Sequence, residues 1–300
     1  MLELDEHDAK TNTWRFRENS GPFAQESVRR TETSSCSGCA LHHLCIPAGI
    51  DRADSDKLGP AIRGVRPVRR GQPLYRMGDP FRSLYSVRAG SFKSVVMHRD
   101  GREHVTAFHL VGETLGVDGI CTNRHACDVI ALEDSLACIM PFNRIELLCR
   151  EVASVQRHVH KITSAEIVRE SGLLMLLASM NADERLAAFL LNISARLQRA
   201  GYSPAEFLLR MTREEMGNYL GLQLETVSRA LSKFQKAGFI EVRGKQIHIV
   251  DGVDCGSSAR SCHAAIFAGR RPPIHGLHGL SSHSPRRRLA SMWRSTSGDQ

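Results

Sequence analysis

The chain has 300 residues, of which 42% are hydrophobic and 24% are charged, and a formal net charge of +8 at pH 7. This composition is that of a globular protein, and the length allows about two domains. The acidic first residues exclude a secretory or mitochondrial leader, and the longest apolar run is far shorter than the roughly 20 residues of a membrane span. We therefore expect a cytoplasmic protein with no membrane partner. The positive charge favours a polyanion as ligand.

Residues 1–33 are polar and lack sustained periodicity, so we expect a disordered extension. Three thiols follow within ten residues, at Cys36, Cys39 and Cys45. In a reducing compartment this grouping favours metal or redox chemistry over disulfides, because thiolates are soft ligands that select zinc, copper(I) or iron–sulfur centres. The residues alone leave open an iron–sulfur cluster, a zinc site that includes a neighbouring histidine, and a thiol redox switch. A fourth thiolate has to come from far along the chain, and spacing does not choose among Cys121, Cys127, Cys138 and Cys149.

Residues 65–142 have the pattern of an all-β unit. From Gly78 to Gly112 glycines recur at spacings of 12, 11 and 11 residues, which is typical of turns in a sandwich or roll. Asp100-Gly101 predicts a two-residue hairpin turn, because glycine accepts a positive φ. The strand-like runs are Leu84–Val87, Phe92–Met97, His104–Leu110 and Val129–Leu132. We assign residues 34–143 to one sensor domain that includes the cysteine segment.

From about residue 144 to residue 180 the pattern predicts one long helix with two stripes. The first, apolar stripe is Val152, Val155, Val159 and Ile162. The second stripe is His160, Thr163, Ile167, Glu170 and Leu174. A helix with two such faces tends to bury both, so we expect one to pack on the β unit and the other to pair with a second subunit. The alternative is a single-chain helix with one solvated stripe.

Residues 181–250 predict a compact helical unit that ends in a hairpin. Thr212 and Glu215 form a capping box that starts one helix, a tight turn follows at 221–223, and a second helix runs over 224–236 until Gly238 stops it. Two short strand-like runs then form a wing, so the unit is a winged helix-turn-helix. The predicted packing core is Met216, Leu220, Leu222, Val227 and Leu231.

The charge pattern of this unit favours double-stranded DNA as its partner. Between residues 229 and 245 there are five basic residues and a single acid, as a surface facing phosphates requires. Glu225, Ser228 and Arg229 share one face at the start of the second helix, the end that enters the major groove. Arginine can grip guanine, glutamate can accept from cytosine, and serine is adaptable. The chain has no nucleophile motif, phosphate loop or paired carboxylates that would indicate an enzyme.

Residues 251–300 are rich in Ser, Gly, Arg and His, and we expect a disordered basic tail.

Residues 213–229 and the wing resemble the DNA-binding domain of the CRP/FNR superfamily. The run from Leu224 to Arg229 resembles the FNR branch, whose E-x-x-S-R helix reads TTGAT half-sites, and the resemblance covers about residues 36–250. It implies an α+β fold with an N-terminal cyclic-nucleotide-binding-like β-roll, a long dimerisation helix and a C-terminal winged helix-turn-helix. It also implies a homodimer that contacts RNA polymerase.

The same resemblance implies a [4Fe-4S] cluster that oxygen degrades, with dimerisation and DNA binding lost together. Cys36, Cys39 and Cys45 match the three amino-terminal ligands of FNR. The fourth ligand comes from the β-roll, where Cys138 matches more closely than Cys127. Cyclic AMP, the ligand of the other branch, is not expected, because Asp128 occupies the position of the phosphate-binding arginine and its carboxylate would repel a phosphate.

The predicted dimer seam departs from the FNR pattern. Glu170 stands where FNR has an aspartate, and His160 and Thr163 weaken the seam as an apolar zipper. Both departures favour a dimer of marginal stability, so that a sensor could shift the equilibrium between monomer and dimer.

Overall fold

The computed structural model describes the ranges 62–97 and 101–250, five residues between 39 and 45, and the backbone of two N-terminal strands. Those strands, β1 (Leu4–Asp8) and β2 (Thr13–Phe16), form an antiparallel pair inside the extension in which the sequence predicts no regular structure. The rest of that extension and the predicted tail at 251–300 lie outside the described residues. Among the helices that are described, none combines the length and hydropathy of a membrane span.

The N-terminal half of the described chain is a β-roll made of two four-stranded antiparallel sheets, which confirms the predicted all-β unit. The first sheet has the order β3 (Gly64–Val68), β10 (Ser135–Pro141), β5 (Ser83–Ala89), β8 (Thr114–Leu115). The second has the order β4 (Pro73–Tyr75), β9 (Asp128–Ala131), β6 (Phe92–Met97), β7 (Glu103–His109). Apolar side chains of both sheets, such as Val87 and Phe92, are fully buried between them.

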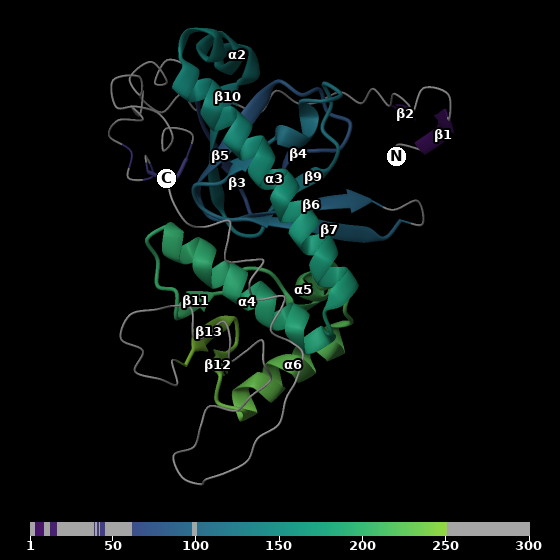
Figure 1. Cartoon of the computed structure of the whole chain (residues 1–300), viewed down its shortest axis with the longest axis vertical. Coiled ribbons are helices and arrows are strands. Elements are labelled where there is room, and N and C mark those ends of the chain that lie inside the picture. The colour runs from purple at the N-terminus through teal and green to yellow at the C-terminus, as the bar shows by residue number, and fades with distance from the viewer. Residues whose placement is uncertain are drawn as a thin grey trace, which may run out of the picture.

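The predicted single helix over 144–180 is wrong, because two helices occupy this range: α2 (Phe142–Glu151) and α3 (Ala153–Ser179). They are separated at Val152, whose backbone is extended at φ −130° and ψ 100°. A β-branched valine tolerates this conformation, and its buried side chain joins a small core beneath both helices with Ile145 and Val155. The break therefore lets both helices cover the roll, and α3 then descends past it toward the C-terminal unit (Figure 1).

The C-terminal unit is a winged helix-turn-helix, as predicted. Its elements are α4 (Ala182–Arg199), β11 (Glu206–Leu208), α5 (Arg213–Leu220), α6 (Leu224–Lys236), β12 (Ile240–Arg243) and β13 (Gln246–Ile249). The wing strands β12 and β13 pair as expected, and β11, which the sequence does not predict, adds a third strand beside β13. Asn181 and Glu184 form a second capping box at the start of α4.

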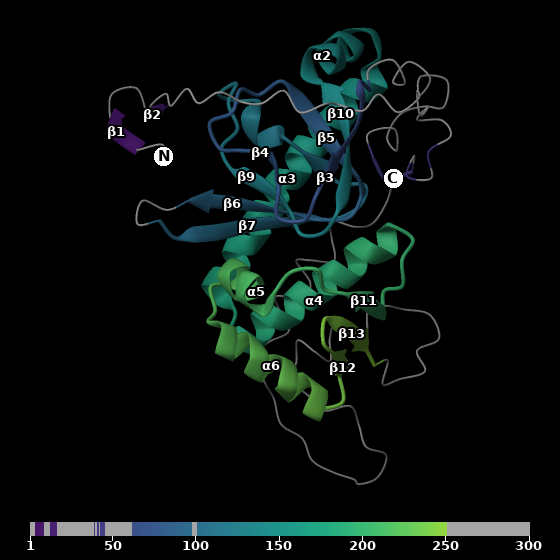
Figure 2. The ribbon, with the colours of Figure 1, turned by 180° about the vertical axis from the view of Figure 1, so that it is seen from behind.

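One hydrophobic core runs through both units. Val95 and Phe108 of the roll belong to the same buried cluster as Phe189 of α4 and Met216 of α5. From behind, α5 lies directly beneath the β6–β7 hairpin (Figure 2). The DNA-binding unit is therefore packed against the β-roll rather than tethered to it through α3 alone, and the α+β architecture is confirmed.

Candidate sensor site and DNA interface

The cysteine segment lies on the β-roll at Gly112. In the described part of this segment, Leu44 N–H donates to the Leu41 carbonyl at 2.9 Å and Cys45 N–H donates to the same carbonyl at 3.2 Å, as in a turn. Gly112 has a φ of +88°, and a Cβ atom added there would lie 2.7 Å from the Cβ atom of Leu44. Glycine is needed at this position both for the backbone conformation and for the close approach of the cysteine segment.

Cys138 lies on β10, opposite Val65 of β3 and Ser86 of β5. Burial raises the pKa of its thiol, the neighbouring Arg88 guanidinium opposes this rise, and the charge of Cys39 adds to it. The thiol of Cys138 is therefore a neighbour of a thiol of the cysteine segment.

Cys127 lies in a different environment, directly before β9 and beside the carboxylate of Asp118, which belongs to a short 3-10 helix, Val117–Gly119. Its Sγ donates to Asp118 Oδ2 at 3.6 Å, and Asp118 also accepts from the Ala126 N–H at 2.8 Å and from the Tyr75 hydroxyl at 3.0 Å. Burial and the charge of Asp118 raise the pKa of Cys127 far above its ordinary value. A thiol held protonated in this way is a poor metal ligand.

The remaining thiols do not complete a metal site on their own. Cys121 is exposed and Cys149 is partly buried beneath the helices, whereas Cys36 lies outside the described residues. In the part of the chain that the structure describes, no three His, Cys, Asp or Glu side chains are grouped closely enough to hold a metal ion. The four-cysteine set therefore stays a prediction.

The two predicted stripes of the helix differ in burial. Val152 and Val155 are buried against the roll, and Val159 and Ile162 pack partly on the same core. The second stripe is open, because Ile167 is 64% exposed, Leu174 is 68% exposed, and His160 and Glu170 are exposed as well. The exception is Thr163, which is half-buried and donates its hydroxyl to the Val159 and His160 carbonyls.

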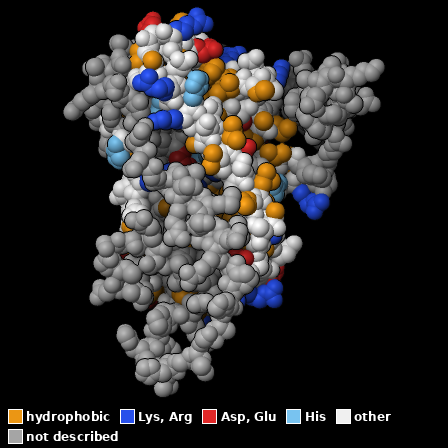
Figure 3. Space-filling model, in the orientation of Figure 1, with side chains coloured by type: hydrophobic (Ala, Val, Ile, Leu, Met, Phe, Trp, Pro, Cys, Tyr) orange, Lys and Arg blue, Asp and Glu red, His pale blue; other side chains and the backbone are white. Residues whose placement is uncertain are grey.

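Hydrophobic side chains form a band on the face of the molecule that carries α3 (Figure 3). Val168 and Met175 widen the open stripe, since both are exposed. An apolar band of this kind on a helix that already buries its other face is typical of an interface.

The helix-turn-helix is rigid for local reasons. Thr212 accepts from the Glu215 N–H at 3.1 Å, and the Glu215 carboxylate accepts from the Thr212 N–H at 2.6 Å, which confirms the capping box. A Cβ atom on Gly217 would lie 2.6 Å from the Leu222 carbonyl oxygen, so only glycine lets the turn close. The predicted core is confirmed, with Leu222 half-buried and with Met216, Leu220, Val227 and Leu231 buried.

The predicted base-reading face is accessible. Glu225 and Arg229 are exposed, and Ser228 is half-buried beside them on α6. Arg213, at the first position of α5, donates to the Ser228 hydroxyl at 3.2 Å. Arg213 is not among the DNA-binding residues predicted from the sequence, although a basic side chain directly after the capping Thr212 was a usable signal.

The basic residues beyond this face have different partners. Lys233 pairs with Asp183 of α4, and Lys245 donates to the Arg210 carbonyl at 2.8 Å. Lys236 is exposed at the last turn of α6, and within the described residues its ammonium group has no partner. Lys236 is therefore the better candidate for a phosphate contact, because Lys233 has an ion pair to break first.

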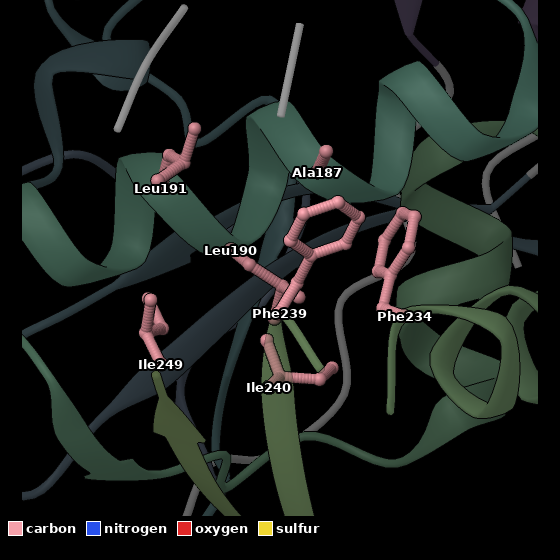
Figure 4. Close-up of a pocket in the computed structure, with 7 residues that line it drawn as sticks. All are labelled: Ala187, Leu190, Leu191, Phe234, Phe239, Ile240 and Ile249. Atoms are coloured by element: carbon pink, nitrogen blue, oxygen red, sulfur yellow. The ribbon is translucent and has the colours of Figure 1, made fainter. Parts of the chain in front are cut away.

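A small apolar pocket lies where α4 meets the end of α6 and the wing (Figure 4). It is lined by Ala187, Leu190, Leu191, Phe234, Phe239, Ile240 and Ile249. These contacts hold the recognition helix and the wing on the same support.

The comparisons agree with both units. Residues 184–252 match the Crp-like helix-turn-helix domain, and residues 65–152 match the cyclic nucleotide-binding domain. Electron transport regulator A of Shewanella oneidensis is 40% identical over 229 residues, which are 74% of this chain and 92% of that protein. The transcriptional activator protein anr of Pseudomonas aeruginosa is 38% identical over 227 residues, 76% of this chain and 93% of that one. The fumarate nitrate reduction regulatory protein of Klebsiella oxytoca is 39% identical over 226 residues, 74% and 90%.

Among solved structures, FixK2 from Bradyrhizobium japonicum aligns with a TM-score of 0.58 at 28% identity, covering 65% of this chain and 98% of that one. The regulator CLP of Xanthomonas campestris shares the fold, with a TM-score of 0.54 at 21% identity, covering 66% and 99%. With full-length relatives near 40% identity and both domains matched, the chain belongs to the FNR group of the CRP/FNR superfamily of DNA-binding transcription regulators.

Proposed function

We propose that this protein is an oxygen-responsive regulator that binds TTGAT-type inverted repeats as a homodimer when oxygen is low. A [4Fe-4S] cluster held by Cys36, Cys39, Cys45 and Cys138 is its sensor. These four cysteines would hold the cluster, and the cluster would supply chemistry that is sensitive to oxygen. RNA polymerase is the expected partner of the DNA-bound dimer, and the protein acts in the cytoplasm.

The observation that carries this proposal is that Cys138, and not Cys127, has a thiol of the cysteine segment among its electrostatic neighbours. Cys138 and Cys39 are electrostatic neighbours, and the Arg88 guanidinium beside Cys138 opposes the rise in the pKa of its thiol that burial and Cys39 cause. Cys127 has a carboxylate for a neighbour, which would repel a cluster that carries a net negative charge. The donor set therefore fits a four-thiolate cluster better through Cys138.

The strand that carries Cys138 also offers a route to the dimer helix. Met140 lies two residues further along β10 and thus on the same face of the sheet as Cys138. Its buried side chain packs in the core that includes Val152 and Val155 at the start of α3. A shift of β10 at Cys138 would therefore alter the support of the helix that carries the open stripe.

Anaerobic purification followed by iron and acid-labile sulfide analysis tests the proposal. We expect about four iron atoms per chain, as one [4Fe-4S] centre requires. Cys138→Ala should lose the iron and the brown colour, whereas the matched control Cys127→Ala should keep both. Stoichiometric zinc without sulfide would instead support a zinc regulator of the same fold, and loss of iron in Cys127→Ala but not in Cys138→Ala would refute the assigned ligand.

The family match to a cyclic nucleotide-binding domain does not lead us to propose a nucleotide ligand. Asp128, where the resemblance places the phosphate-binding arginine, accepts the Met77 N–H at 2.7 Å. A carboxylate held at that point disfavours a phosphate, so we expect no stabilisation of the protein by cyclic AMP.

A further inference from the structure

Strand β7 lies at the edge of its sheet, with β6 on one side and, among the described residues, no strand on the other. The side-chain amide of Asn218, on α5, occupies that open edge. Its Oδ1 accepts from the Val105 N–H at 2.6 Å, and its Nδ2 donates to the Glu103 carbonyl at 2.7 Å. A residue of a parallel neighbouring strand bonds the same two backbone groups, one on each side of His104. Asn218 therefore replaces one residue of a missing strand.

Asparagine is specific for this task. The edge offers one donor and one acceptor, so the partner has to accept and donate within a single short planar group. Aspartate keeps the acceptor for Val105 but puts a second oxygen against the Glu103 carbonyl. Alanine leaves both backbone groups without a partner, and a partly buried unpaired group is destabilising.

Two further contacts lie on the same face of α5. Glu215, three residues before Asn218, forms an ion pair with Lys93 of β6 at 2.9 Å while its other oxygen caps the helix. Tyr219 packs against Phe108 of β7 with ring centroids 5.3 Å apart. Positions three and four apart share one side of a helix, so the short helix α5 is held against the β6–β7 hairpin along its length (Figure 2).

The contacts that hold α5 on the roll also set the position of the recognition helix α6. The turn between α5 and α6 is closed by the contact of Gly217 with Leu222, whose N–H donates to the Gly217 carbonyl at 2.8 Å. Glu225 and Arg229 stay exposed in this arrangement, so the docked form is able to read DNA.

We propose that Asn218 is a positioning residue: it sets the orientation of the recognition helix on the sensor roll, and sequence-specific DNA binding depends on it. The inference goes beyond the proposed oxygen response and does not depend on which centre the cysteines hold. Asn218 itself faces the roll, and its contribution to DNA binding acts through α5 and α6.

The test compares Asn218→Ala and Asn218→Asp with the wild-type full-length protein, and Gln198→Ala, which removes an exposed amide of α4, is the control. The DNA is a duplex selected from random sequences by the wild-type protein, so the result does not depend on TTGAT being the site. We expect specific affinity to fall about tenfold in Asn218→Ala while affinity for random DNA changes less than twofold. Hydrogen exchange at the Val105 amide should become at least tenfold faster, and sedimentation should show an unchanged dimer.

Equal losses for specific and random DNA would overturn the proposal, because they indicate general destabilisation. Faster exchange with unchanged or tighter specific binding would also overturn it, because the contact would then be only structural. Should Asn218→Ala not fold, the isosteric Asn218→Asp gives the answer. It keeps the acceptor for the Val105 N–H and loses the donor to the Glu103 carbonyl, so we expect a smaller rise in the exchange rate of the Val105 amide and the same fall in specificity.

Discussion

The ion pair between Arg196 of α4 and Glu113 of the roll joins the two units, and its contribution to the free energy of unfolding can be measured. Arg196 Nε donates to Glu113 Oε1 at 2.8 Å, and Nη2 donates to Oε2 and to the Phe108 carbonyl, both at 2.5 Å. The side chain of Arg196 is 8% exposed and that of Glu113 is 29% exposed. Arg196→Met keeps most of the length and leaves the Glu113 carboxylate half-buried without a cation.

Removal of one partner from a buried pair lowers the free energy of unfolding by about 3–5 kcal/mol. Because Glu113 keeps part of its solvent contact, we expect the lower end, about 3 kcal/mol, from Arg196→Met. With an m-value of about 3 kcal/mol/M, the urea midpoint at fixed protein concentration should fall by about 1 M. Adding Glu113→Gln should recover part of the loss. A loss below about 1 kcal/mol, or strictly additive effects of the two substitutions, would show that Arg196 and Glu113 behave as a surface pair and not as a buried one.

The same pair predicts a pH dependence. Burial alone would raise the pKa of Glu113, but the charge and hydrogen bonds of Arg196 outweigh it and hold the pKa below its ordinary value. A carboxyl with a lowered pKa contributes stability that is complete above the unfolded-chain pKa of about 4.3 and is lost as the pH falls through the folded value. Arg196→Met removes the charge that outweighs burial, so the pKa of Glu113 rises in the folded variant, while the unfolded-chain pKa is the same in both proteins. The difference in unfolding free energy between wild type and Arg196→Met should therefore be constant well above the raised pKa of Glu113 in the variant and shrink as the pH falls through it.

Three other predictions concern the dimer and the DNA-binding unit. Glu170→Ala should remove like-charge repulsion across the seam and give a dimer that binds DNA in air, and an unchanged monomer in sedimentation would contradict the seam. Arg229→Ala should lower affinity for the matched half-site by about 1–3 kcal/mol and relax the preference for its guanine, whereas Lys236→Ala should weaken binding to all sequences alike and reduce the salt slope by about one. Titrations against matched and mutated sites at several salt concentrations separate the two effects. Equal weakening of specific and random DNA binding by Arg229→Ala would contradict its base-reading role. Gly217→Ala should destabilise the motif by about 1–3 kcal/mol in thermal unfolding, because its Cβ would meet the Leu222 carbonyl, and a neutral result would show that the turn can shift.

The helix-turn-helix could be predicted from the sequence because its signals are local. Residues close together in the sequence predict the capping box at Thr212, the glycines of the turn and the bounds of α6. The structure has each of these features. The β-roll followed from the spacing of its turn glycines in the same way. These features depend on backbone conformations that single residue types favour.

Features that depend on packing were not predictable in this way. The break at Val152 has no glycine or proline to mark it, and it arises because the valine side chain joins a buried core. The three-residue strand β11 is too short to have a period. The two hydrogen bonds of Asn218 to β7 join residues that are separated by 113 and 115 positions in the sequence, and no local pattern predicts them.

The cysteine site is an intermediate case. Spacing identified the segment at Cys36–Cys45 as a unit but could not choose its distant partner. The family resemblance favoured Cys138, which has Cys39 and the Arg88 guanidinium as electrostatic neighbours, whereas Cys127 has the Asp118 carboxylate.

We propose above that oxygen controls DNA binding through the cysteine-held centre. The direct measurement is the binding of anaerobically isolated protein to a duplex with two inverted TTGAT half-sites, followed by fluorescence anisotropy before and after exposure to air. We expect tight, sequence-specific binding before exposure and its loss afterwards, together with loss of the iron signal. Binding of equal affinity before and after exposure, with the iron gone, would contradict it.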